Sequence, residues 1–320
     1  MNLAILRARA KIVSAVRRFF DEQGFVEVET AVRIPAPAPE EHIDCPPVVD
    51  GGYLRASPEL QMKKLLAAGM DKIYQIGPCF REGERGSRHN PEFTMIEWYR
   101  KNATYLDIAN DLERLLGCVA RFANDSSRSS KSSDSSDSSM ASNSSCSSDS
   151  SMASPARRLS VRDAYLRFVG WDPWQGPWDQ DRFDFDMATK IEPAIKELGG
   201  GVFLMDYPPQ AASLAKVTEE EEREPGAARR AYAERWEFYW DGLELANCFT
   251  ELCDREEQLK RFEAAKASRK LLNEADYPID YEFIDSLPQM GHAAGVALGI
   301  DRLVMVLTNS KEISAVRANI

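Results

Sequence analysis

The chain is organised around residues 80–100, which read FREGERGSRHNPEFTMIEWYR. The first half of this stretch is a glycine-containing loop with four side chains that can contact an anion, Arg81, Arg88, His89 and Asn90. The second half is an apolar and aromatic run that alternates like a strand, and residues 72–76 before the loop are also strand-like. The sequence therefore predicts a hairpin with a cationic turn, in which Phe93 can offer a flat face to a base.

A second arginine follows a glycine pair in residues 295–302, GVALGIDR, just before the apolar run LVMVL. The run predicts a helix, and the free amides at a helix start together with a guanidinium favour an anion. The chain has no GxxxxGK[ST], GxGxxG or GxSxG motif, which argues against Walker-type kinases, dinucleotide-binding enzymes and α/β-hydrolases. Arg81 and Arg302 together therefore predict a site for a polyphosphate.

The remaining periodicities predict an α+β domain. Strands follow one another without regular helical crossovers, which favours an antiparallel sheet flanked by helices over a doubly wound parallel sheet. We expect a single domain over residues 1–320. Helical spacing covers residues 3–23, 57–68, 105–122, 159–169, 183–198 and 256–272, and strand-like alternation covers 25–29, 72–76, 93–99, 202–207 and 235–240.

Residues 125–154 differ in composition from the rest, with 18 serines among 30 residues. Such a segment has too little apolar surface to offset the entropy of ordering, so we predict a disordered surface insertion.

The totals restrict the partners. A net charge of -11 disfavours extensive contact with nucleic acid, which makes tRNA an unlikely partner. No apolar run of 18 or more residues occurs, and arginine and lysine interrupt the N-terminal apolar stretch, so we expect no membrane association and a cytoplasmic protein.

Two glutamates in GLELANCFTEL, Glu244 and Glu251, are candidate ligands. An odd spacing of seven sends them to opposite faces of a regular strand, so they converge only if the chain bends near Asn247. Two such carboxylates could hold Mg²⁺ or bind an ammonium group, and two exposed surface glutamates fit the spacing equally well. Glu59, in a first helical turn, could join Glu251 in binding a diamino substrate, with Ser57 and Tyr99 nearby.

These motifs resemble the catalytic core of class II aminoacyl-tRNA synthetases of the lysyl branch. Within that branch the chain is most similar to the truncated paralogues that ligate (R)-beta-lysine to elongation factor P. The resemblance covers about residues 3–316 without the serine-rich segment, and four stretches carry it in order, SPELQMKKLL, FREGERGSRHNPEFTMIEWYR, GLELANCFTEL and GVALGIDRLVMVL.

The resemblance implies roles for individual residues. Arg81 would contact the α-phosphate of ATP, and Phe93 and Arg302 would enclose the adenine. Glu244 and Glu251 would hold Mg²⁺, with Glu251 also facing the substrate amine. His89, Asn90, Leu245 and Gly299 would complete the ATP site, and Ser57, Glu59, Tyr99 and Ala297 would line the amino-acid pocket.

Four departures from the family pattern matter. Gly83 stands where an acidic residue is expected, so Glu82 or Glu84 would serve, and we favour Glu84. Ala297 replaces a glycine of the synthetases and would reshape the amino-acid pocket. Cys248 replaces another glycine and would be strained if its φ were positive. Ala31 replaces a proline in the first strand, a part of the implied dimer interface.

The implied enzyme is an AMP-forming ligase that uses ATP and Mg²⁺. It would activate (R)-beta-lysine or lysine as an adenylate and transfer it to a lysine side chain of elongation factor P, as a homodimer. The chain begins at the first helix of the core, which leaves no room for an anticodon-binding domain. Two alternatives stay open, a lysyl-tRNA synthetase-like enzyme that charges tRNA and a non-catalytic regulatory paralogue.

Overall fold

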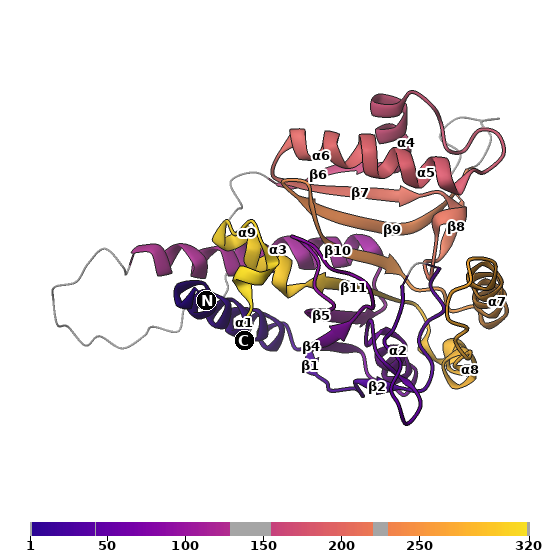
Figure 1. Ribbon diagram of the computed structural model, residues 1–320, viewed down its shortest axis with the longest axis horizontal. Helices are drawn as coiled ribbons and strands as arrows, with labels where there is room; N and C mark the ends of the chain where they lie inside the picture. The colour runs from indigo at the N-terminus through magenta and orange to yellow at the C-terminus, as the bar shows by residue number, and fades with distance from the viewer. Residues whose placement is uncertain (1, 42, 129–154, 220–229, 319–320) are drawn as a thin grey trace.

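The computed structural model describes residues 2–41, 43–128, 155–219 and 230–318, and these residues build a nine-stranded sheet (Figure 1). The strand order is β1-β4-β5-β11-β10-β9-β7-β6, with β8 paired to β9. The strands are β1 (Val26–Glu27), β4 (Lys72–Phe80), β5 (Glu92–Lys101), β6 (Arg157–Ser160), β7 (Gly201–Tyr207), β8 (Val217–Glu219), β9 (Ala231–Trp240), β10 (Leu243–Thr250) and β11 (Ala293–Gly299), and β2 (Arg33–Ile34) pairs separately with β3 (Tyr53–Leu54).

The predicted α+β class is confirmed, and the central pairs of the sheet are antiparallel. Two pairs differ, because β1 runs parallel to β4 and β6 runs parallel to β7. Strand β6 also corrects the predicted helix over residues 159–169. Four residues are too few to show a strand period, and helix α4 (Val161–Ala164) begins only where the Ser160 hydroxyl accepts a hydrogen bond from the Asp163 amide at 3.0 Å.

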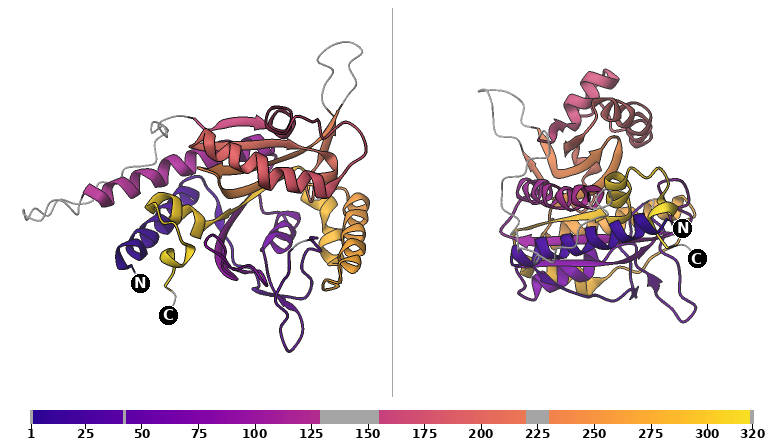
Figure 2. Two further views of the ribbon diagram at one scale, coloured as in Figure 1. Left: turned by 45° about the horizontal axis from the view of Figure 1, so that its top comes forward. Right: turned by 90° about the vertical axis from the view of Figure 1, so that its left-hand side faces the viewer.

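Helices cover the two faces of the sheet differently (Figures 1 and 2). One face packs against α1 (Leu3–Glu22), α3 (Tyr105–Arg128) and α9 (Ile300–Thr308) in a continuous apolar core. The other face is covered at its two ends. One end carries α2 (Glu59–Ala67), α7 (Arg255–Leu271) and α8 (Tyr281–Met290), and the other carries α4, η1 (Tyr165–Val169), α5 (Gln180–Asp186), η2 (Met187–Ile191) and α6 (Glu192–Leu198).

Most helix predictions hold, with shifted ends. The predicted helix over residues 183–198 is interrupted by the π-helical turn η2. Helix α3 continues to Arg128, so the start of the serine-rich segment is helical, and the rest of that prediction lies in 129–154, outside the described residues. Short 3₁₀ turns occur at Pro209–Ala211 (η3) and Ile313–Val316 (η4). In the described ranges, no helix is both long and apolar enough to span a bilayer.

Candidate active site

The pairing of strands β5, β11, β10 and β9 places polar side chains together on the half-covered face of the sheet. Alternate residues of a strand point to the same face, so residues that pair across β5, β11, β10 and β9 form rows. One row comprises Glu97, Ala297, Asn247 and Glu237, and the next comprises Tyr99, Gly295, Phe249 and Arg235. The residues between them, such as Trp98, point to the apolar core on the opposite face.

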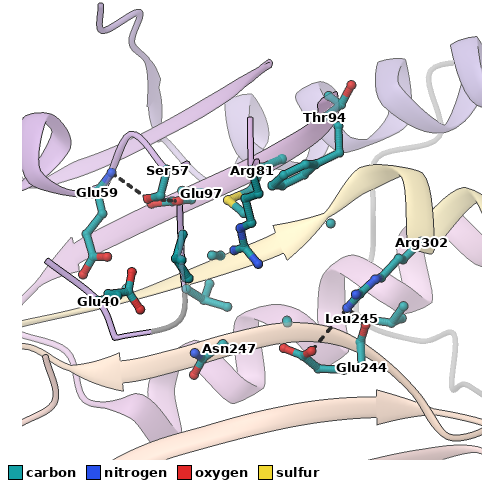
Figure 3. A pocket seen from close by; sticks show the side chains of 18 of the residues that line it. Glu40, Ser57, Glu59, Arg81, Thr94, Glu97, Glu244, Leu245, Asn247 and Arg302 are labelled. Atoms are coloured by element: carbon teal, nitrogen blue, oxygen red, sulfur yellow. Dashed lines mark hydrogen bonds and ion pairs between the residues drawn. The ribbon is translucent and has the colours of Figure 1, made fainter. Parts of the chain in front are cut away.

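A cavity of about 390 Å³ lies over these two rows of residues (Figure 3). It brings together most of the predicted site residues, which come from segments far apart in the sequence. Those that line it are Ser57, Glu59, Arg81, Glu84, His89, Asn90, Phe93, Tyr99, Glu244, Leu245, Ala297, Gly299 and Arg302. Glu82, Gly83 and Glu251 do not line it.

One end of the cavity is cationic. The Arg81 guanidinium lies 5.2 Å from the centre of the Phe93 ring. Arg302, in the first turn of α9, donates to the Glu244 carbonyl at 2.9 Å and contacts its carboxylate at 3.2 Å. Its other terminal nitrogen lies 2.8 Å from Nε2 of His89. Burial and the Arg302 charge lower the pKa of His89, which keeps this ring neutral and able to accept that hydrogen bond.

The loop after β4 explains the unusual position of its acid. Gly83 has a φ of +77°, a conformation that an ordinary side chain strains. A glutamate side chain at this position would therefore be strained, which fits the prediction that a neighbouring glutamate serves instead. Glu84 lines the cavity with Oε1 3.4 Å from Arg81, whereas Glu82 is exposed.

The other end of the cavity is anionic, and its central residue was missed by the sequence analysis. Glu97 accepts hydrogen bonds from the Ser57 hydroxyl at 2.6 Å and the Tyr99 hydroxyl at 2.7 Å. Burial, with a contribution from Glu59, raises the pKa of Glu97 to about 7. The available signal was a glutamate at an inward position of an otherwise apolar strand, between Ile96 and Trp98.

A buried ion cluster stands beside this end. The Lys63 ammonium, 2% exposed, contacts Glu59 at 2.5 Å and also pairs with the fully buried carboxylate of Glu251. Although burial lowers it, these two carboxylates raise the pKa of Lys63 above its usual value. Burial raises the pKa of Glu251 to about 8. The sequence analysis missed Lys63, which the four-residue spacing from Glu59 on one predicted helix could have indicated.

That Glu244 and Glu251 share one Mg²⁺ stays a prediction, and the structure shows where the two side chains lie. A bulge between Glu244 and Ala246 does return both glutamates to the same face, two residues before the predicted bend near Asn247. Glu244 lies near the start of β10, and Glu251 follows directly after its last residue. Cys248 is not among the residues with positive φ, so the strain expected there does not arise.

The residues at the cationic end fit a different arrangement for magnesium. No group of three His, Cys, Asp or Glu side chains suited to a metal occurs within the described ranges. Magnesium, however, is commonly held by one or two carboxylates together with substrate phosphates. Glu244 suits that role, because its carboxylate lines the cavity beside Arg302, at the end that suits phosphates. Glu251 does not line the cavity.

Comparison with known proteins agrees with this architecture. Residues 1–318 match the family model described as tRNA synthetases class II (D, K and N). A relative from Actinobacillus succinogenes, named elongation factor P–(R)-beta-lysine ligase, is 34% identical over 99% of this chain and 95% of its own length. Relatives of the same name from Yersinia enterocolitica and Proteus mirabilis are also 34% identical over 99% of this chain, covering 94% and 95% of their own lengths.

Proposed function

This chain belongs to the class II tRNA synthetase family (D, K and N), and from this premise we propose that it is an ATP-dependent elongation factor P–(R)-beta-lysine ligase. It activates (R)-beta-lysine or lysine as an aminoacyl-adenylate and transfers the acyl group to a lysine side chain of elongation factor P. The relatives named above support the acceptor and the amino acid.

One observation carries the proposal, the opposite charge of the two ends of a single cavity. Arg81 and Arg302 lie at the end that suits a nucleotide, and Phe93 offers its ring beside Arg81. Glu59 and Glu97 lie at the end that suits ammonium groups. An adenylate of a diamino acid has the complementary distribution of charge along its length, with a negative phosphate between a base and two positive ammonium groups.

The side chains would promote adenylate formation by position and charge. The substrate carboxylate attacks the α-phosphorus of ATP, the bond to the β-phosphate oxygen breaks, and pyrophosphate leaves. Arg81 would neutralise charge at the α-phosphate, and Arg302 would hold the nucleotide from α9, steadied by His89 and Glu244. Mg²⁺ held by Glu244 and the phosphates would stabilise negative charge on those phosphates. Bound ammonium groups fix the carboxylate in line for attack.

Acyl transfer then needs only an amine. The neutral lysine amine of the acceptor attacks the carbonyl carbon of the adenylate, and the bond from that carbon to the phosphate oxygen breaks. AMP leaves, the nitrogen loses a proton to solvent and an amide forms, so no covalent enzyme intermediate is required. We further propose that the enzyme is a cytoplasmic homodimer with a single catalytic domain and that tRNA is not its acceptor. The net charge of -11 supports the last point, because an acidic surface repels nucleic acid.

Two assays test the proposal. The first assay follows exchange of labelled pyrophosphate into ATP with (R)-beta-lysine and with lysine. The exchange should depend on the amino acid, and a protein that shows no exchange with either amino acid rejects the activation step. Incubation of the enzyme, ATP and labelled amino acid with purified elongation factor P and, separately, with tRNA identifies the acceptor. Label found on tRNA alone would instead support the synthetase alternative.

A further inference from the structure

The proline-rich loop before β3 places a glutamate in the cavity. Glu40 lines the anionic end, and Figure 3 shows its carboxylate pointing toward that of Glu59. Among the described residues, no hydrogen bond or ion pair involves the Glu40 side chain, whereas Glu59 and Glu97 are both hydrogen-bonded. Glu40 thus presents a carboxylate that is turned into the cavity and has no partner in the described chain.

The backbone of this loop is anchored at Glu40. The buried Arg269 of α7 donates to the backbone carbonyl of Glu40 at 2.7 Å and to the Asp44 carboxylate at 2.6 Å. The Tyr277 hydroxyl adds a contact of 3.2 Å to Asp44. Three prolines, Pro35, Pro37 and Pro39, fix further backbone angles. Because the backbone is already held, a ligand that binds Glu40 has to order only its side chain.

The anionic end is short of positive charge. Four carboxyl groups gather there, Glu40, Glu59, Glu97 and Glu251, and the ammonium between two of them is that of Lys63. Burial and then Glu59 raise the pKa of Glu40, against the opposing effects of the charges of Arg81, Arg235 and Lys63. Glu251 gives a second, separate sign of this shortage. The residue is 2% exposed, and its buried Oε1 atom has no hydrogen-bond partner. A ligand with two positive charges would compensate this excess.

We propose that Glu40 is a specificity-determining residue that binds one of the two ammonium groups of a diamino acid substrate, opposite Glu59. The inference rests on the proposed function and adds to it a contact from a loop outside the four motif stretches. The inference also explains the role of Arg269, whose guanidinium positions the loop that carries Glu40 and does not line the cavity.

The test is pyrophosphate exchange with the full-length chain carrying Glu40→Gln, Glu40→Asp or Asp50→Asn. Glu40→Gln keeps the shape and removes the charge, and it should raise KM for the diamino acid roughly 10- to 100-fold, the range expected for a hydrogen bond to a charged group. Its kcat should stay within a few-fold of wild type. Glu40→Asp should recover part of the affinity. Asp50→Asn removes a charge from an exposed turn of the same region and should leave KM unchanged.

Analogues that each lack one amino group separate binding from a general effect on the loop. Glu40→Gln should change KM for only one of the two, since the other has already lost the ammonium that Glu40 contacts. An unchanged KM for the diamino acid, or an equal loss with both analogues, would overturn the inference. If the wild type shows no exchange at all, the proposed function fails instead. Calorimetric titration of the diamino acid into Glu40→Gln then still reports whether Glu40 contributes to binding.

Discussion

Replacing Lys63 by methionine would remove the ammonium that lies between Glu59 and Glu251 and leave two carboxylates without it. The side chains of Lys63 and Glu251 are 2% and 0% exposed, so water cannot take over the lost contacts. Removing one partner of a buried ion pair costs about 3 to 5 kcal/mol. We expect a loss of that size in the free energy of unfolding at pH 7.5, which is a large part of the stability of a typical domain.

The loss should depend on pH, because a carboxyl group of the pair can take up a proton once the ammonium is gone. A carboxyl whose folded-state pKa is raised stabilises the folded protein at low pH, and this contribution disappears as the pH rises above the ordinary value near 4.5. Glu251 of the wild type has a pKa of about 8 and is largely protonated at both pH 5.5 and pH 7.5, so the cost of Lys63→Met should grow only above pH 8, by up to about 1.4 kcal/mol per pH unit.

Urea unfolding followed by tryptophan fluorescence measures both quantities. Lys260→Met is the matched control, because that lysine is 81% exposed and lies 3.9 Å from Glu257, so its loss should change stability by less than about 0.5 kcal/mol. A Lys63→Met variant as stable as this control at pH 7.5 would refute the buried cluster. A loss that does not grow above pH 8 would refute the protonation argument.

Three further outcomes follow from the site. Arg302→Ala should lower pyrophosphate exchange roughly 100-fold or more, since it removes a charge at the nucleotide end, and a variant with near-normal exchange would contradict the assignment. Gly295→Ala should lower the free energy of unfolding by about 1 to 3 kcal/mol, because its Cβ would lie 2.1 Å from Cδ1 of Tyr99. Gly86→Ala meets no atom within 4 Å and should be neutral in the same urea titration. Glu97 has a pKa of about 7 in the folded state against 4.5 ordinarily, so wild type should lose on the order of 3 kcal/mol between pH 4.5 and 7 relative to Glu97→Gln. Parallel stability curves for the two proteins would show that this pKa is not raised.

The sequence allowed the fold class and much of the cationic end to be predicted, because these depend on local patterns. Strand alternation and the glycine-containing turn indicate the hairpin, and charged residues beside an apolar helix start indicate where Arg302 lies. Gly83 similarly indicates a turn, since glycine adopts a positive φ, as it does here, without strain. Each of these features is determined within about ten residues, where periodicity and residue type carry the information.

The rest of the cavity depends on long-range contacts that no local pattern contains. A bulge at Leu245 shifts the register by one residue, and this shift decides whether Glu244 faces the cavity or the core. Glu40 reaches the cavity because Arg269, 229 residues away in the chain, anchors its loop. Carboxylates that look like independent surface charges in the sequence therefore become one buried group only after the sheet and α7 have assembled. Substrate selection consequently depends on the packing of α7 as well as on the residues that contact the ligand, and Arg269→Lys should raise KM for the diamino acid even though Arg269 does not line the cavity.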